Sequence, residues 1–201
     1  MQTNSNLSNQ HGLAITSSNA VAVKFHDKAV AGYLGLRSDV GTHLKAMFDA
    51  DPDIVMGHIL KGYFYKLFAN PVLDSKTEQA IKTAEISVSK RGANPRELQH
   101  IAALKEWQEG KLLGAVHIWE DILKENPLDV VALRLAYHTY FYLGDLSNGR
   151  DLPARVMHAW SKDIPCYGFV LGVYAFALEE AGDYAAAEQH GRHAVEINAG
   201  D

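Results

Sequence analysis

Three of the ten histidines stand where they could combine in one site. His58, His100 and His138 fall on the expected first helices of three successive helical hairpins, so they could approach one another across the stack. Three histidines with an open coordination position would suit a catalytic zinc ion. The sequence has no HExxH pair, however, and a packing histidine bonded to a neighbouring helix explains His58 without a ligand. We therefore predict no metal ion and no other cofactor.

Aromatic side chains and one arginine form a second candidate site. If the helices stack as repeat hairpins, certain positions of each first helix face a common concave surface. The predicted surface contains His100, Trp107, Arg134, His138, Tyr142 and Phe176. Such rings supply buried area for an extended or helical peptide, and Arg134 can hold a carboxylate through two hydrogen bonds. In the competing interpretation, rings such as Trp107 and Phe176 only pack against neighbouring helices.

The helices that would position these residues are marked by turn glycines. Gly110, Gly144 and Gly182 stand 34 and 38 residues apart in helix-periodic sequence, and Pro127 follows Gly110 by 17 residues. A period near 34 with a glycine at each tight turn is typical of tetratricopeptide repeats. We predict an all-α, right-handed solenoid of about five antiparallel helix pairs. The pairs cover residues 19–50, 53–91, 95–126, 129–161 and 166–198.

Local signals place two helix starts and the domain boundary. Ser75 with Glu78, and Asn94-Pro95-Arg96-Glu97, both read as capping boxes that satisfy free backbone donors. Residues 1–18 are rich in Asn, Gln and Ser, and no strand-like alternation of any length occurs. We expect residues 1–18 to be disordered or loosely attached, and residues 19–201 to form one TPR-like domain.

Composition narrows the function classes. Hydrophobic residues make up 47% of the chain and charged residues 21%, and the formal net charge is −5. Without a basic stripe, nucleic acid is not expected as a partner. No run of 18 apolar residues indicates a membrane span, and residues 1–18 do not form a secretory signal. The single cysteine, Cys166, excludes an internal disulfide and suits a reducing compartment, so we expect a cytoplasmic protein.

Several strings resemble the tetratricopeptide repeat protein 38 family over nearly the whole chain. These are Ala50-Asp51-Pro52, Val55-Met56-Gly57-His58, Arg96-Glu97 with His100, Tyr140-Phe141-Tyr142-Leu143-Gly144, Asp163-Ile164-Pro165 and Tyr174-Ala175-Phe176-Ala177-Leu178-Glu179. The resemblance implies a soluble helical-repeat protein whose biochemical role is not well defined. Members of that family are about twice as long, so this sequence looks like their N-terminal half.

A solenoid that stops after its last hairpin leaves one face without a neighbour. Here the last pair carries apolar residues that could remain exposed, namely Phe169, Leu171, Tyr174 and Val195. An exposed face of this kind promotes self-association or binding of a partner. We therefore expect possible self-association through the last helix pair.

Two functions from different classes follow from these observations. The first is a noncatalytic interaction module that binds a peptide or partner-protein segment on the concave surface. The second is a small-molecule-binding protein or enzyme whose pocket uses His58, His100, His138 and a cluster of tyrosines near Tyr142, completed by a missing C-terminal half. No catalytic residue is assigned, because the sequence contains neither a Gly-x-Ser-x-Gly elbow nor a phosphate-binding loop.

Overall fold

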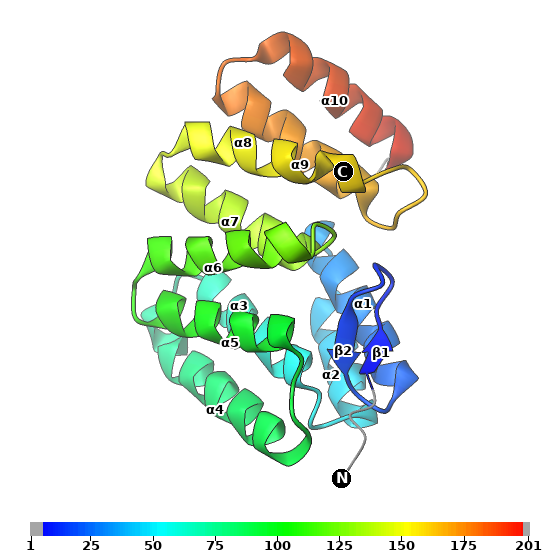
Figure 1. The fold of residues 1–201 in the computed structure, drawn as a ribbon, viewed down its shortest axis with the longest axis vertical. Coiled ribbons are helices and arrows are strands. Elements are labelled where there is room, and N and C mark those ends of the chain that lie inside the picture. The colour runs from blue at the N-terminus through cyan, green and yellow to red at the C-terminus, as the bar shows by residue number, and fades with distance from the viewer. Residues whose placement is uncertain (1–5, 199–201) are drawn as a thin grey trace. The chain divides into compact units, whose positions relative to one another are not determined.

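The computed structural model describes residues 6–198, and ten α-helices account for most of them (Figure 1). The helices are α1 (Ala20–Leu34), α2 (Val40–Ala50), α3 (Val55–Leu67), α4 (Asp74–Arg91), α5 (Pro95–Gln108), α6 (Leu112–Glu125), α7 (Val130–Leu143), α8 (Leu146–Val156), α9 (Tyr167–Glu180) and α10 (Tyr184–Ile197). Their bounds agree with the five predicted pairs to within a few residues. The predicted helical fold is thus confirmed at this level.

The chain divides into two compact units, one up to Ile118 and one from Trp119 onward, and the division falls within α6. In the first unit, α1 packs on α2, and α3 packs on both α4 and α5. In the second unit, α7 packs on α8, α8 on α9, and α9 on α10. Sequence neighbours are therefore packing neighbours within each unit. A single domain over residues 19–201, the TPR-like pairing and the handedness of the solenoid stay predictions.

The predicted turn glycines do end helices. Gly110, Gly144 and Gly182 have φ angles of 77°, 72° and 85°, a left-handed backbone that glycine adopts without steric cost. At the end of α7, the N–H of Gly144 donates to the carbonyl of Phe141 at 3.0 Å. The turn positions could be predicted because this requirement is local.

One predicted helix start is confirmed and the other is wrong. The side chain of Asn94 accepts from the Glu97 N–H at 3.0 Å, and the Glu97 carboxylate accepts from the Asn94 N–H at 3.1 Å. Ser75, by contrast, lies inside α4. A short 3-10 turn at Pro71–Leu73, capped by Asn70, runs directly into α4, so helical backbone begins before Ser75.

The N-terminal segment is a β-hairpin, which corrects the expectation of a loose tail over residues 1–18. Strands β1 (Asn6–Ser8) and β2 (Ala14–Thr16) pair antiparallel, and Ile15 is fully buried. The Asn9 side chain shapes the turn by accepting from the backbone N–H groups of His11 and Leu13, both at 2.9 Å. Residues 1–5 of the predicted tail lie outside the described residues.

Close packing of α3 against α5 depends on a glycine. A Cβ atom at Gly62 would overlap the side chain of Leu104, which is fully buried. Gly62 therefore lets the two helices approach closely, the role that its small size predicts in a helical repeat. Tyr63, the next residue, is also fully buried in this core.

The last helix pair exposes a different set of apolar side chains from the one predicted, with Phe176, Tyr184 and Ile197 exposed on α9 and α10. Leu171 is buried, Phe169 and Tyr174 are partly buried, and only Val195 of the four predicted residues is largely exposed, at 54%. Self-association through this pair stays a prediction. Among the described residues, no helix combines the length and the hydropathy that a membrane span requires.

Candidate functional site

Four of the six predicted binding residues come together in the second unit, on helices α7 and α9. Ring centroids lie 5.4 Å apart between Phe141 and Phe176, 5.8 Å between Phe141 and Tyr142, and 6.3 Å between His138 and Tyr142. These spacings are those of interacting aromatic pairs. We call the surface formed by Arg134, His138, Phe141, Tyr142 and Phe176 the α7–α9 face.

Helical periodicity produces this face. Arg134, His138 and Tyr142 follow one another at four-residue intervals along α7, so they share one side of the helix. Phe141, three residues after His138, lies beside them and meets Phe176 of α9. The helical period of α7 alone therefore places Arg134, His138 and Tyr142 on one side of that helix.

The α7–α9 face is open to solvent at its aromatic end. Tyr142 is 78% exposed and Phe176 is 40% exposed, and both rings contact Phe141. Contiguous exposed apolar side chains are uncommon on a surface with no binding role. Accessible rings therefore make this end of the face a candidate contact surface.

The polar end of the face has unmet hydrogen-bonding capacity. Nε of Arg134 and Nδ1 of His138 are buried and have no hydrogen-bond partner among residues 6–198. Burial, and then the positive charge of Arg134, lower the pKa of His138 to about 4. His138 is consequently neutral at pH 7, and Arg134 is the only charged side chain in α7.

His100 and Trp107 belong to the first unit, and His100 does not line a surface. Its side chain is fully buried, with Nδ1 3.0 Å from the hydroxyl oxygen of Tyr63. That hydroxyl also donates to the carbonyl of His100 at 2.9 Å. His100 is therefore buried in this structure rather than surface-lining, and its binding role stays a prediction. Trp107 is half-buried, with its ring centroid 6.1 Å from that of Tyr63.

His58 also makes a packing contact rather than an open ligand position. Its Nε2 donates to the carbonyl of Pro52 at 2.9 Å, and its ring lies 4.7 Å from that of Phe48. Burial lowers the pKa of His58, more than the Pro52 carbonyl raises it. Within residues 6–198, no three His, Cys, Asp or Glu side chains are grouped so that they could hold a metal ion.

Arg150 and Asp151 of α8 follow the tyrosines near Tyr142 in sequence. Those two residues are exposed and pair with each other, with 2.7 Å between Nη2 and Oδ1. Tyr140 is buried, and burial followed by the charge of Glu120 raises its pKa to about 12. Tyr140 is therefore a protonated packing residue at neutral pH.

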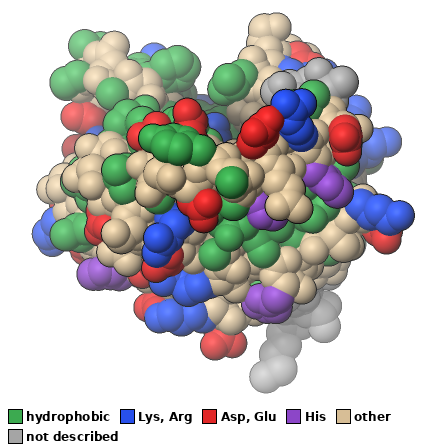
Figure 2. Space-filling model, turned by 90° about the horizontal axis from the view of Figure 1, so that it is seen from above, with side chains coloured by type: hydrophobic (Ala, Val, Ile, Leu, Met, Phe, Trp, Pro, Cys, Tyr) green, Lys and Arg blue, Asp and Glu red, His purple; other side chains and the backbone are tan. Residues whose placement is uncertain are grey.

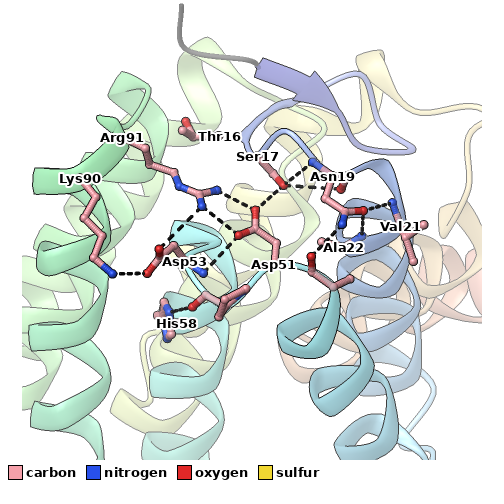
Figure 3. A network of polar contacts seen from close by, with 12 residues as sticks. Thr16, Ser17, Asn19, Val21, Ala22, Asp51, Asp53, His58, Lys90 and Arg91 are labelled. Carbon is pink, nitrogen blue, oxygen red and sulfur yellow. Dashed lines mark hydrogen bonds and ion pairs between the residues drawn. The ribbon is translucent and has the colours of Figure 1, made fainter. Parts of the chain in front are cut away.

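A polar network in the first unit was not predicted from the sequence. Arg91 of α4 binds the Asp51 carboxylate with both Nη atoms, at 2.6 and 2.9 Å, and the Ser17 hydroxyl donates to the same carboxylate at 2.6 Å (Figure 3). Lys90 binds the neighbouring Asp53 at 2.7 Å. Burial alone would raise the pKa of Asp51, but the hydrogen bonds from Arg91 and Ser17 outweigh it and lower that pKa.

A second buried carboxylate anchors the end of the N-terminal hairpin. Glu97 is fully buried and accepts from the Thr16 N–H at 2.9 Å and from the Thr16 hydroxyl at 2.5 Å. The side chains of Asn94 and Arg96 donate to the carbonyl of Ala14, at 3.0 and 2.8 Å. Together with Asp51, these contacts hold residues 14–17 against α4 and α5. Their role is structural, because every polar group involved has a partner within the chain.

No protein-family model matches this chain, and no solved structure matches it either. The resemblance to the tetratricopeptide repeat protein 38 family therefore stays a prediction from the sequence strings. On the face shown in Figure 2, Lys and Arg side chains are interspersed with Asp and Glu side chains, so that face has no extended patch of one charge.

Proposed function

We propose that the protein is a noncatalytic interaction module that binds a segment of another protein on the α7–α9 face. The observation that carries this proposal is the row of rings on that face, with Tyr142 and Phe176 accessible to solvent. Exposed tyrosine and phenylalanine side chains held by neighbouring rings bury large area at small entropic cost when a partner binds.

Arg134 gives the proposed segment a chemical preference. It makes no ion pair among the described residues, so its guanidinium would pair with a carboxylate of the segment. The bound segment then carries an acidic side chain near Arg134 and apolar or aromatic side chains against Phe141, Tyr142 and Phe176. The site lies wholly on helices of the second unit.

We further propose the finer architecture as part of this function. The helix pairs would stack as a right-handed TPR-like solenoid of the tetratricopeptide repeat protein 38 type, with the α7–α9 face on its concave side. Support comes from the adjacent packing of successive helices and from the left-handed glycines at the hairpin turns. We propose that this solenoid is a scaffold protein in the cytoplasm, since a chain with a single cysteine suits a reducing compartment.

The alternative of an enzyme or small-molecule site lined by histidines gains less support. His100 is buried against Tyr63, and His58 binds the backbone of Pro52, so neither ring offers a free ligand position. Of these three histidines, only His138 has a buried ring nitrogen without a hydrogen-bond partner among residues 6–198. The histidine site therefore lacks the convergence that metal or acid–base chemistry requires.

A pull-down from host lysate with matched variants tests the proposal. The test variant is Arg134→Ala with Tyr142→Ala. The control is Arg150→Ala with Tyr184→Ala, which also removes one arginine and one exposed tyrosine, the latter 70% exposed on α10. Circular dichroism establishes equal helicity. We expect a protein retained by the intact chain and the control but lost from the test variant. Equal retention by all three, or retention of nothing, would contradict the proposal.

A further inference from the structure

A cleft lies beside α6 and α8 in the second unit and shares no residue with the α7–α9 face. Residues 120–127 form one wall, and residues 152–158 form the other. The cleft has a volume of about 410 Å³. Sites for small molecules commonly enclose about 300 to 1,000 Å³, so this cleft has the size of a site for a small ligand.

Two hydrogen bonds join the walls and hold them in place. Nη2 of Arg155 on α8 donates to Oε1 of Glu120 on α6 at 2.5 Å. Farther along both walls, the indole N–H of Trp160 donates to the carbonyl of Pro127 at 3.0 Å. Trp160 is only 6% exposed, so the second contact is anchored in the core. The cleft is therefore formed before any ligand binds, which lowers the entropic cost of binding.

The floor of the cleft is apolar and small. Leu152 and Val156 are four residues apart on α8, so they share one side of that helix. Leu123 of α6 belongs to the opposite wall. Each of these side chains is at most 4% exposed. So little accessible apolar surface suits one short aliphatic side chain and cannot cover a long hydrocarbon tail.

The rim of the cleft carries charges of both signs. Glu120 and Lys124 are one helical turn apart on α6, with about 5 to 6 Å between their Cβ atoms. A carboxylate offers about four acceptor positions, so Glu120 can accept from another donor besides Arg155. Nε and Nη1 of Arg155 make no hydrogen bond within residues 6–198, so they are free to donate to a ligand.

His158 adds a second acceptor to the rim. Its Nδ1 lies 2.9 Å from the backbone carbonyl of Arg155. A carbonyl oxygen only accepts, so Nδ1 carries the proton of the neutral ring and Nε2 is left as an acceptor. The rim thus accepts at Glu120 and His158. It donates at Arg155 and Lys124.

We propose that this cleft binds a free α-amino acid with a short branched aliphatic side chain, such as leucine. The α-ammonium group donates to Glu120 and to Nε2 of His158. The α-carboxylate accepts from Arg155 and Lys124. The aliphatic side chain lies on the apolar floor, where it leaves water.

The charge balance of the rim favours a zwitterion over a simple anion or cation. Lys124 binds Asp121 at 2.7 Å, and Arg155 binds Glu120. These four side chains carry equal numbers of positive and negative charges. A ligand with one group of each sign therefore pairs with the rim without leaving a net charge in the cleft.

Amide NMR spectra of the full chain, titrated with L-leucine, test this site. We expect saturable shifts at the amides of Leu123, Lys124 and Val156. Three analogues each lack one part of the ligand: 4-methylpentanoate lacks the ammonium group, 3-methylbutylamine lacks the carboxylate, and glycine lacks the side chain. Removing either charged group should weaken binding roughly tenfold, the loss of a charge-assisted hydrogen bond. Glycine should also bind more weakly than leucine.

Two variants assign the roles of the ion pair. Glu120→Gln should weaken the binding of leucine and 3-methylbutylamine but not of 4-methylpentanoate, because only the ammonium contact is lost. Arg155→Gln should weaken the binding of leucine and 4-methylpentanoate but not of 3-methylbutylamine. A merely structural role of either residue would weaken every ligand alike. The matched controls Glu188→Gln and Arg192→Gln divide an exposed ion pair on α10 and should bind leucine as the intact chain does.

Three results would overturn the amino-acid site: no saturable shift with leucine, equal affinity for an analogue that lacks a charged group, or equal affinity in Glu120→Gln and its control Glu188→Gln. A last comparison distinguishes a free amino acid from the end of a peptide. Leucinamide mimics an N-terminal leucine, and N-acetylleucine mimics a C-terminal one. Free leucine should bind more tightly than both, and equal binding of either would overturn the free amino acid as the ligand.

Discussion

Arg91 and Asp51 form a two-fold ion pair across 40 residues of sequence, with both Nη atoms within 2.9 Å of the carboxylate oxygens. Asp51 is only 5% exposed, so removing its partner leaves a buried charge without compensation. We predict that Arg91→Ala lowers the free energy of unfolding by about 3 kcal/mol. Lys90→Ala removes the neighbouring exposed pair with Asp53 and should cost less than about 1 kcal/mol. Denaturant titrations measure the free energy of unfolding of both variants. Equal losses would contradict the larger contribution predicted for the buried Arg91–Asp51 pair.

The anchor of the N-terminal hairpin makes a separate prediction. Glu97→Ala removes the acceptor of two Thr16 donors, so the hairpin should lose its attachment to α5. We expect faster hydrogen exchange of the amides in residues 6–16 and a loss of about 2 to 3 kcal/mol, typical of hydrogen bonds to a charged group. The exposed Glu109→Ala, at the end of α5, serves as the control. Unchanged exchange in residues 6–16 would show that the hairpin is held by other contacts.

Helix boundaries were predictable from the sequence because they depend on local chemistry. Gly144 requires a left-handed backbone, and Asn94 with Glu97 satisfies free donors at the start of α5, whatever surrounds them. The α7–α9 face followed from the same locality, since the spacing of Arg134, His138 and Tyr142 fixes their common side. These features need only the helical period and residue type.

Contacts between distant segments were not predictable. The burial of His100 depends on Tyr63, 37 residues away, and the hairpin depends on Glu97, 81 residues after Thr16. Strands of three residues carry almost no alternation, so the tail looked unstructured. Ser75 had the pattern of a capping residue, but the turn capped by Asn70 starts the helix earlier. For His100 and the hairpin, tertiary packing decided between local alternatives, whereas at Ser75 a competing local cap did.

The titration of His138 predicts how stability depends on pH. Its pKa is about 4 in the folded chain, whereas an unfolded histidine titrates near 6.5. Between these values the unfolded state binds the proton more readily than the folded state. The free energy of unfolding is therefore at its full value above about pH 6.5 and falls as the pH decreases. The loss should reach about 2 kcal/mol at pH 5.

Denaturant midpoints between pH 7 and pH 5 measure this loss in the intact chain and in His138→Gln. The stability of the variant should depend less steeply on pH, because His138 is gone. The pKa of His58 is also lowered, but His58 contributes equally in both proteins. Identical slopes would show that His138 does not resist protonation in the folded chain.

Packing of α3 on α5 predicts opposite effects of two glycine-to-alanine changes. A methyl group at Gly62 would overlap Leu104, so Gly62→Ala should destabilise the chain by about 1 to 3 kcal/mol. Gly41, in α2, has open space around it, and Gly41→Ala should stabilise by about 0.5 to 1 kcal/mol. Thermal melting followed by circular dichroism compares them. A neutral Gly62→Ala would mean that the two helices are not in close contact.

The central claim is that α7 and α9 hold the bound segment, and hydrogen–deuterium exchange of the chain with and without its captured partner tests this most directly. We predict that added protection is concentrated in residues 130–143 and 167–180, and that it disappears in Arg134→Ala with Tyr142→Ala. Protection centred on α4 or α10 instead, with no change in α7 and α9, would contradict the account.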